Sequence, residues 1–318
     1  MKDYLLDAAL TLRRNYQDLP FDALGNEETA RRVNERVTAA LQHAAAAFAY
    51  LRPADIRPEK RAELRRRRLL GAEGQDAPYG AAFLRADGNV CVETAGADHF
   101  AISAYDEEGA LSGCLPSARA TAAGLEDSGP MARSEQFGFL TASPSDAGTG
   151  LRATLTLHLP MTLLRRQTPA AIRAAAQTGA TLHPVGNGLF RLENRVTMGA
   201  DAEELVRRLV QTADRLCEME ENLRQAARGR GDVLVLDAAW RAYGVARYAR
   251  RLDRAEALRL WSGLALGASM EKMPYGEDAA DALYRIATDP LEGGTEETPL
   301  QRDVARAERV RALLDGGN

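Results

Sequence analysis

The chain has 318 residues, of which 45% are hydrophobic and 27% are charged, and its formal net charge is −4 at pH 7. This composition is typical of a folded globular protein, and the small negative charge argues against a general attraction to nucleic acid or acidic lipid. No run of about 18 apolar residues occurs, so we expect no membrane span, and the charged N-terminal stretch is unlike a secretory signal.

Residues 1–70 are predicted to be mainly helical. The sequence Asn26-Glu27-Glu28 begins an Ala- and Arg-rich segment with an apolar stripe at helical spacing: Val33, Val37, Leu41 and Ala45. Four consecutive arginines follow at 65–68. Two interpretations of them stay open, a solvated helix face and a patch that binds phosphate.

From residue 79 to 198 the pattern changes to short strands and turns. Strands are predicted over 81–85, 90–93, 100–104, 151–159 and 189–192, and a helix over 169–177. Asp87-Gly88 lies between two of these strands, and Asp-Gly is a strong signal for a hairpin turn. The region is therefore predicted to be α+β, with a largely antiparallel sheet.

The C-terminal third is predicted to be helical. A long helix starts after Asp201, with Glu204 three residues on, and ends at Gly229 and Gly231. The segment 228–232 is the best linker candidate, so we predict two domains, 1–229 and 230–318. Thr298, Pro299 and Gln301 mark the start of the last helix.

The cysteines bear on the cellular compartment. Cys91, Cys114 and Cys217 are odd in number, widely spaced and without metal-ligand spacing. These features are typical of reduced thiols, and we expect a cytoplasmic protein without a metal site.

Four segments, in the same order, resemble the phosphagen (guanido) kinases and in particular the bacterial protein arginine kinases. They are the loop and strand at 138–160, the stretch 188–199, the helical segments within 240–267, and the R-D-x-x-R-A motif at 302–307. The resemblance implies a saddle-shaped antiparallel sheet flanked by helices, followed by a helical domain. It also implies transfer of the γ-phosphoryl group of Mg-ATP to protein arginine, which marks proteins for an AAA+ protease in bacterial quality control.

The chain departs from this family where the chemistry is done. The family's S-S-R-x-R-L-A-R-N falls on residues 7–15, so two phosphate-binding arginines become Ala9 and Thr11. The family's N-E-E-D-H-x-R falls on residues 95–101, so both glutamates are lost, including the catalytic base, and the phosphate-binding arginine becomes Ala101. Ala97 is therefore a degenerate catalytic position.

Further departures concern the rest of the active site. The cysteine of the C-P-T-N loop is Ser143, and the R-G-x-x-G-E segment is shortened to residues 181–186. Arg152 alone clearly survives from the phosphate-binding arginines, although it could equally be a sheet arginine paired with a carboxylate. Asp98 and His99 adjoin the lost base, but on a strand Asp98 would face away from Ala97, and His99 is expected to be a partly buried structural histidine with its hydrogen bonds satisfied.

The C-terminal motif is intact. On a helix Arg302 and Arg306 are four residues apart and share a face, which Arg309 extends. The resemblance implies that the two guanidinium groups bind the phosphoryl group of phosphoarginine, while Asp303 accepts hydrogen bonds from the guanidinium of the ligand. A solvated helix with ion pairs along it is the alternative interpretation.

The contrast between the lost and the intact motifs favours a pseudokinase that binds phosphoarginine or a partner kinase in bacterial protein quality control. Two alternatives remain, an active ATP:protein-arginine phosphotransferase with an altered active site and a structural subunit of a kinase complex. No cofactor is predicted, except that Mg-ATP would bind if nucleotide binding is retained. The expected partners are phosphoarginine-bearing proteins, an active kinase paralogue, a zinc-finger activator, an AAA+ protease, or a second copy of the chain.

Overall fold

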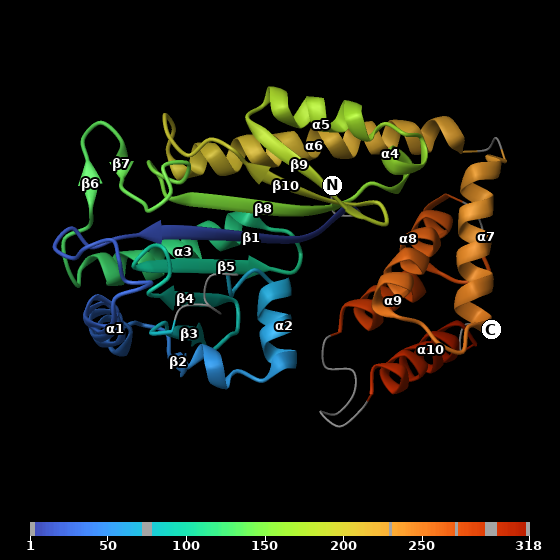
Figure 1. Cartoon of the computed structure of the whole chain (residues 1–318). Helices are drawn as coiled ribbons and strands as arrows, with labels where there is room; N and C mark the ends of the chain where they lie inside the picture. Colours follow the sequence, from blue (N-terminus) through green and yellow to red (C-terminus); the bar gives the residue numbers. More distant parts are fainter. Residues whose placement is uncertain (1–3, 72–77, 229–230, 271–272, 290–297, 316–318) are drawn as a thin grey trace. The chain divides into compact units, whose positions relative to one another are not determined.

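The computed structural model describes residues 4–71, 78–228, 231–270, 273–289 and 298–315 (Figure 1). The chain divides into two compact units. The sheet unit comprises Met1–Leu157, Ile172–His183 and Arg191–Asp214, and the helical unit comprises His158–Ala171, Pro184–Phe190 and Arg215–Asn318. The domain boundary at 229/230 stays a prediction, because Gly229 and Arg230 lie outside the described residues.

The architecture is α+β, with an antiparallel sheet and flanking helices, as predicted. Eight strands form the main sheet, in the order β2 (Phe48–Leu51), β3 (Ala82–Arg85), β4 (Val90–Thr94), β5 (Phe100–Asp106), β1 (Leu5–Arg14), β8 (Leu151–His158), β10 (Leu189–Asn194) and β9 (Ala180–Gly186). A small second sheet pairs β6 (Arg133–Ser134) with β7 (Gly138–Phe139). The strands predicted from alternation and from Asp-Gly are all present, with small changes at their ends.

Strand β1 corrects the prediction of a mainly helical N-terminus. It lies between β5 and β8 and pairs antiparallel with both, so that Thr11 is opposite Ser103 on one side and Arg152 on the other. Most of its side chains are buried, because it is a central strand of the sheet. Alanine and leucine are good helix formers, but helix propensities differ by less than about 1 kcal/mol per residue among ordinary residues, and pairing on both edges of the strand outweighs that preference here.

The sheet unit also contains helices α1 (Glu27–Gln42), α2 (Pro58–Arg66) and α3 (Leu111–Glu126), of which α3 packs on β1 and β5 and α1 contacts β4. Helices α5 (Thr168–Gln177) and α6 (Ala202–Ala227) each have residues in both units. The start of α1 is confirmed, since the Asn26 side chain accepts hydrogen bonds from the backbone N–H groups of Glu28 and Thr29. Val33, Val37 and Leu41 are buried as predicted, whereas Ala45 lies beyond the end of α1 and is exposed. Helix α3 was not predicted.

The helical unit contains α4 (Pro160–Leu164), α7 (Val233–Tyr248), α8 (Arg254–Met270), α9 (Glu277–Thr288) and α10 (Pro299–Asp315). The predicted start of α10 is confirmed: the N–H of Gln301 donates to Thr298 Oγ1 at 3.3 Å, and the Gln301 side chain accepts from the N–H of Thr298 at 2.8 Å. Among the described residues, no helix is both long and apolar enough to cross a membrane.

Two glycines let α7 and α8 approach closely. A Cβ added at Gly263 would lie 2.7 Å from Ala242 Cβ, and one at Gly267 would lie 2.7 Å from Ala239 Cβ. Both distances are too short for carbon atoms in contact. Close packing of α7 against α8 therefore depends on the absence of a side chain at Gly263 and Gly267.

We predict that Gly263→Ala destabilises the protein by about 1–3 kcal/mol, because the added methyl group overpacks the α7–α8 contact. Urea unfolding measures the change. Gly244→Ala is the matched control, since a Cβ there would meet no described atom within 4 Å, and the gain in helix propensity should stabilise by about 0.5–1 kcal/mol. Equal stabilisation by both substitutions would contradict the prediction.

Candidate functional site

A cavity of about 430 Å³ in the sheet unit gathers most of the positions that the family resemblance singles out. Its lining includes Ala9 and Thr11 from β1, Arg152 from β8, and Ala97 and Ser143 from loops. Antiparallel pairing across the sheet brings these residues together although they are far apart in sequence. The adjoining cavity, of about 400 Å³, includes Ala101 and shares several lining residues with the first.

Arg152 is held by neighbouring side chains. Its Nε donates to Asp146 Oδ1 at 2.5 Å, and its Nη2 donates to Ser145 Oγ at 3.1 Å. The Asp146 side chain is 9% exposed and that of Arg152 is 33% exposed, so the ion pair is partly buried. The geometry therefore supports the second interpretation of Arg152, in which it is an arginine of the sheet paired with a carboxylate.

A second arginine joins this group. Arg13 Nε lies 3.5 Å from Asp98 Oδ2 and 3.6 Å from Asp146 Oδ2. Asp98 Oδ1 also accepts hydrogen bonds from Asn15 Nδ2 at 2.6 Å and from the backbone N–H of Ala142 at 2.7 Å. Asp98 is thus engaged by several donors and holds the loop around Ala142 against the end of β1.

The placement of Asp98 corrects one expectation. The segment 95–99 is not a strand, because β4 ends at Thr94 and β5 begins at Phe100, and Ala95 has φ +54°. Asp98 therefore lines the same cavity as Ala97 instead of facing away from it. Alternation of side chains holds only within a strand, so it does not apply across this turn.

His99 is the structural histidine that the sequence suggested, and it is fully buried instead of partly buried. Its Nδ1 accepts from the backbone N–H of Tyr16 at 2.9 Å, and its Nε2 lies 2.6 Å from the carbonyl oxygen of Pro20. The neutral ring with a proton on Nε2 satisfies both contacts. Burial lowers the pKa of His99, which also favours the neutral form.

Ser143 lines the cavity from an exposed position of its loop, and its Oγ is 2.8 Å from Ser145 Oγ, so its hydroxyl bonds to a neighbouring residue of the same loop. The shortened segment 181–186 does not line this cavity; it forms most of β9, where His183 is exposed.

The motif on α10 is only partly accessible. Arg306 is 4% exposed, and its Nη1 donates to the carbonyl oxygen of Leu252 at 2.7 Å and to Asp303 Oδ1 at 3.0 Å. Asp303 Oδ2 accepts from Arg251 Nε at 3.1 Å. Arg302 is half-buried. The solvated-helix interpretation therefore does not hold for Arg306, which ties α10 to the segment before α8.

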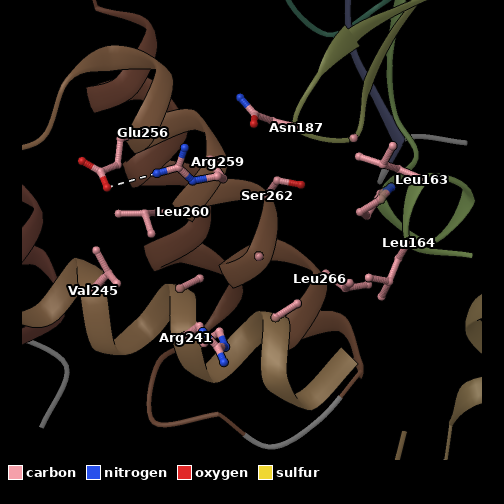
Figure 2. A pocket seen from close by; sticks show the side chains of 15 residues that line it. Leu163, Leu164, Asn187, Arg241, Val245, Glu256, Arg259, Leu260, Ser262 and Leu266 are labelled. Carbon is pink, nitrogen blue, oxygen red and sulfur yellow. Dashed lines mark hydrogen bonds and ion pairs between the residues drawn. The ribbon is translucent and has the colours of Figure 1, made fainter. Parts of the chain in front are cut away.

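The helical unit contains an apolar cavity of about 450 Å³ that the sequence analysis missed (Figure 2). Leu163 and Leu164 from α4, Val245 from α7, and Leu260 and Leu266 from α8 line it. Arg259 also lines it and donates to Glu256 at 3.1 Å. The small residues on the facing sides of α7 and α8 are the only sequence signal that could have indicated this space.

Comparison with known proteins agrees with the resemblance. The family described as ATP:guanido phosphotransferase, C-terminal catalytic domain, matches residues 30–223. The protein-arginine kinase of Moorella thermoacetica is 32% identical over 99% of this chain and 95% of its own length. That of Symbiobacterium thermophilum is 28% identical over 98% of this chain and 93% of its own length.

Solved structures support the fold. The duplicated taurocyamine kinase of Schistosoma mansoni with bound transition-state-analogue components has a TM-score of 0.63 at 17% identity, over 70% of this chain. The chain spans 34% of the length of that protein. A lombricine kinase has a TM-score of 0.61 at 16% identity, over 71% of this chain and 68% of its own.

Proposed function

This chain belongs to the ATP:guanido phosphotransferase family, among the protein-arginine kinases, and we propose that it is a non-catalytic member that binds phosphoarginine on other proteins. Members of this family transfer a phosphoryl group from ATP to a guanidine. The proposal separates two sites. The cavity in the sheet unit no longer performs the transfer, and the motif on α10 recognises the product of that transfer.

The ion pair between Arg152 and Asp146 carries the first half of the proposal. Arg152 is the one arginine clearly retained from the family's phosphate-binding set, and its Nε is bound to a largely buried carboxylate. The C-P-T-N loop of the family ends on Asp146 in this chain, so a negative charge stands where the family has a neutral amide. A phosphate group would have to displace that carboxylate and would be repelled by it.

The residues present do not fit Mg-ATP. The positions expected to bind phosphate are Ala9, Thr11 and Ala101, none of which carries positive charge. Loss of one transition-state arginine can cost about 10³–10⁵ in rate. Loss of a general base, here replaced by Ala97, typically costs about 10²–10⁴. The losses are not additive, but together they leave little of the mechanism.

Incubation with labelled Mg-ATP and an arginine-rich protein tests this half. We expect no acid-labile label on the protein. Acid-labile label that disappears in Arg152→Ala would contradict the proposal and would favour the active phosphotransferase. An active relative, assayed in parallel, confirms that the substrate protein can accept the label.

The half-buried Arg302 and the ion-paired Asp303 support phosphoarginine binding on α10. Two arginines form ion pairs with Asp303: Arg306, which is buried, and Arg251, whose side chain is 64% exposed. Arg302 and Arg251 can donate hydrogen bonds to a phosphoryl group, and the guanidinium of phosphoarginine can bond to Asp303. Arg306 then acts mainly by positioning Asp303.

Calorimetric titration with phosphoarginine tests the second half. We expect saturable binding that Arg302→Ala weakens at least about tenfold, since a hydrogen bond to a charged group contributes about 1.5–3 kcal/mol. Arg306→Ala should abolish binding of phosphoarginine. This substitution also removes buried hydrogen bonds and lowers the stability of the protein, so Arg302→Ala is the more specific test. Arg241→Ala, at an exposed ion pair on α7, is the control for lost charge. Absence of binding to both phosphoarginine and a phosphorylated protein would overturn this half.

The same proposal covers location and partners. We place the protein in the cytoplasm, where it would bind arginine-phosphorylated proteins and deliver them to a partner kinase or protease. Copurification from the native cell tests this part. Recovery of an active kinase paralogue without any dependence on Arg302 would favour a structural subunit instead.

A further inference from the structure

The apolar cavity of the helical unit has no part in the proposed function. Its volume is about 450 Å³, which lies within the range of small-molecule sites, about 300–1,000 Å³. The residues that line it all belong to the helical unit. Neither the family positions of the sheet unit nor the α10 motif contributes to its lining, so it is separate from both sites discussed above.

The interior of the cavity is apolar. Leu260 and Leu266 on α8 and Ala242 on α7 line it and are buried, while Leu163 on α4 lines it from an exposed position, where the cavity meets solvent. Water finds few hydrogen-bonding partners against such a surface. A ligand that replaces this water with apolar atoms therefore gains free energy.

The walls of the cavity are fixed before any ligand binds. Asn187 and Gly188 form the two-residue turn between β9 and β10, and their φ angles of +55° and +75° are those of a tight hairpin turn. The carbonyl oxygen of Gly188 accepts from the N–H of Leu159 at 2.7 Å, which ties this turn to the start of α4. On the other side, α7 and α8 pack closely at Gly263. A preformed cavity loses little conformational freedom when a ligand binds.

The charged side chains among the described lining residues are already paired. Arg259 Nη2 donates to Glu256 at 3.1 Å (Figure 2), and Arg241 Nε donates to Asp237 at 2.8 Å. Both arginine side chains are exposed, so the charges lie in solvent and not against the apolar interior. The two positive charges are balanced by two negative ones. A charged ligand would lose hydration without gaining an unpaired counter-ion here, so the cavity suits a neutral molecule.

One polar side chain of the interior has hydrogen-bonding capacity left. Ser262 on α8 is buried, and its Oγ lies 2.8 Å from His158 Nε2. A hydroxyl group has one donor and two acceptor positions, and this contact uses one of them. Figure 2 shows the Ser262 hydroxyl pointing from α8 across the cavity towards Leu163. A hydroxyl group of a ligand can bond to it there.

We propose that this cavity binds a small neutral molecule with an aliphatic body and one hydroxyl group. The hydroxyl group bonds to Ser262, and the aliphatic body packs on Leu260 and Leu266. This site goes beyond the proposed function, since phosphoarginine and ATP are both charged and polar. Its existence does not depend on phosphoarginine recognition.

Calorimetric titration of the full chain with 1-octanol tests the proposal. We expect saturable binding of one molecule per chain, with a negative heat-capacity change, because apolar surface is buried. Octanoate has a chain of the same length and a charged head group. It should bind more weakly than octanol, because its carboxylate must give up water beside arginines that are already paired.

Two variants test the position of the ligand. Ala238→Leu, at a half-buried lining residue of α7, fills the cavity and should weaken octanol binding at least about tenfold, since that is the effect of excluding about two methylene groups of the ligand. Gly244→Leu is the matched control, because Gly244 is on the same helix and a Cβ there would meet no described atom within 4 Å. Ser262→Ala should weaken binding about two- to tenfold, the effect of losing one neutral hydrogen bond.

Three results would overturn the proposal. The first is octanol that does not bind saturably, or that binds Ala238→Leu as tightly as the parent chain. The second is octanoate that binds as tightly as octanol. The third is a dimer in sedimentation that Ala238→Leu dissociates and Gly244→Leu does not, since a second copy of the chain would then cover the cavity. Arg302→Ala should leave octanol binding unchanged, and loss of phosphoarginine binding alone would count only against the α10 site.

Discussion

Replacing Glu220 by leucine is expected to lower the stability of the helical unit by about 3–5 kcal/mol, the usual cost of removing one partner of a buried ion pair. Glu220 on α6 is fully buried and accepts hydrogen bonds from the backbone N–H groups of Met161 and Thr162, at 2.8 and 2.7 Å. It also accepts from Arg224 Nε at 3.3 Å. Leucine would leave two amides at the start of α4 and one buried guanidinium without this acceptor.

Urea unfolding followed by tryptophan fluorescence measures the loss, since Trp240 and Trp261 both belong to the helical unit. Glu221→Leu is the matched control. Glu221 is next in sequence, but its side chain is 30% exposed and its ion pair with Arg228 is a surface pair, which typically contributes about 0–1 kcal/mol. Similar losses in both variants would show that Glu220 has no special role.

Acid is expected to destabilise the protein below pH 6.5 through His158. This residue is 3% exposed, its Nε2 lies 2.8 Å from Ser262 Oγ, and its ring lies 4.3 Å from that of Trp261. Burial lowers the pKa of His158 to about 3, and the positive charge of Arg224 adds to the effect. In the unfolded chain the pKa is about 6.5.

The sign follows from proton uptake. Between pH 6.5 and 3 the unfolded chain binds a proton at this site and the folded chain does not, so falling pH favours unfolding. The expected loss is about 1.4 kcal/mol per pH unit, or about 2 kcal/mol between pH 6.5 and 5. His99 adds to the loss, because burial lowers its pKa too.

Urea unfolding at several pH values from 7.5 to 5 measures this dependence, above the range in which most carboxylates titrate. His158→Gln keeps a hydrogen-bonding group toward Ser262 and should flatten the dependence. His183→Gln, at an exposed position of β9, should leave it unchanged. A slope that is identical in all three proteins would contradict the assignment.

Local signals in the sequence predicted much of the fold. Alternation over 151–159 identified β8, Asp-Gly identified the β3–β4 hairpin, and the Thr298–Gln301 capping box identified the start of α10. Each of these signals depends on neighbouring residues. Strand β1 could not be predicted in this way, because its partners β5 and β8 lie about 90 and 145 residues further along the chain.

The site was predictable only in part for the same reason. The resemblance indicated which positions to examine, and Ala9, Thr11, Ala97, Ser143 and Arg152 do line one cavity. The contacts of Asp146 with Arg152 and Arg13 could not be predicted from the sequence, because they depend on the path of the loop that carries Asp146. Likewise, the hydrogen bonds that Arg68 donates to Asp7 and Thr156 depend on where α2 ends and on the turn of the chain that follows it.

The central position of β1 has a consequence for how the protein folds during synthesis. Strand β1 is made before β8 and cannot pair with it until residues 151–157, which form most of β8, have also been made. Until then, an apolar segment near the N-terminus lacks one of its two neighbours and is open to wrong pairing or aggregation. Contacts between residues so distant in sequence also slow folding. Expression of this protein should therefore depend on chaperones more than its size alone would suggest.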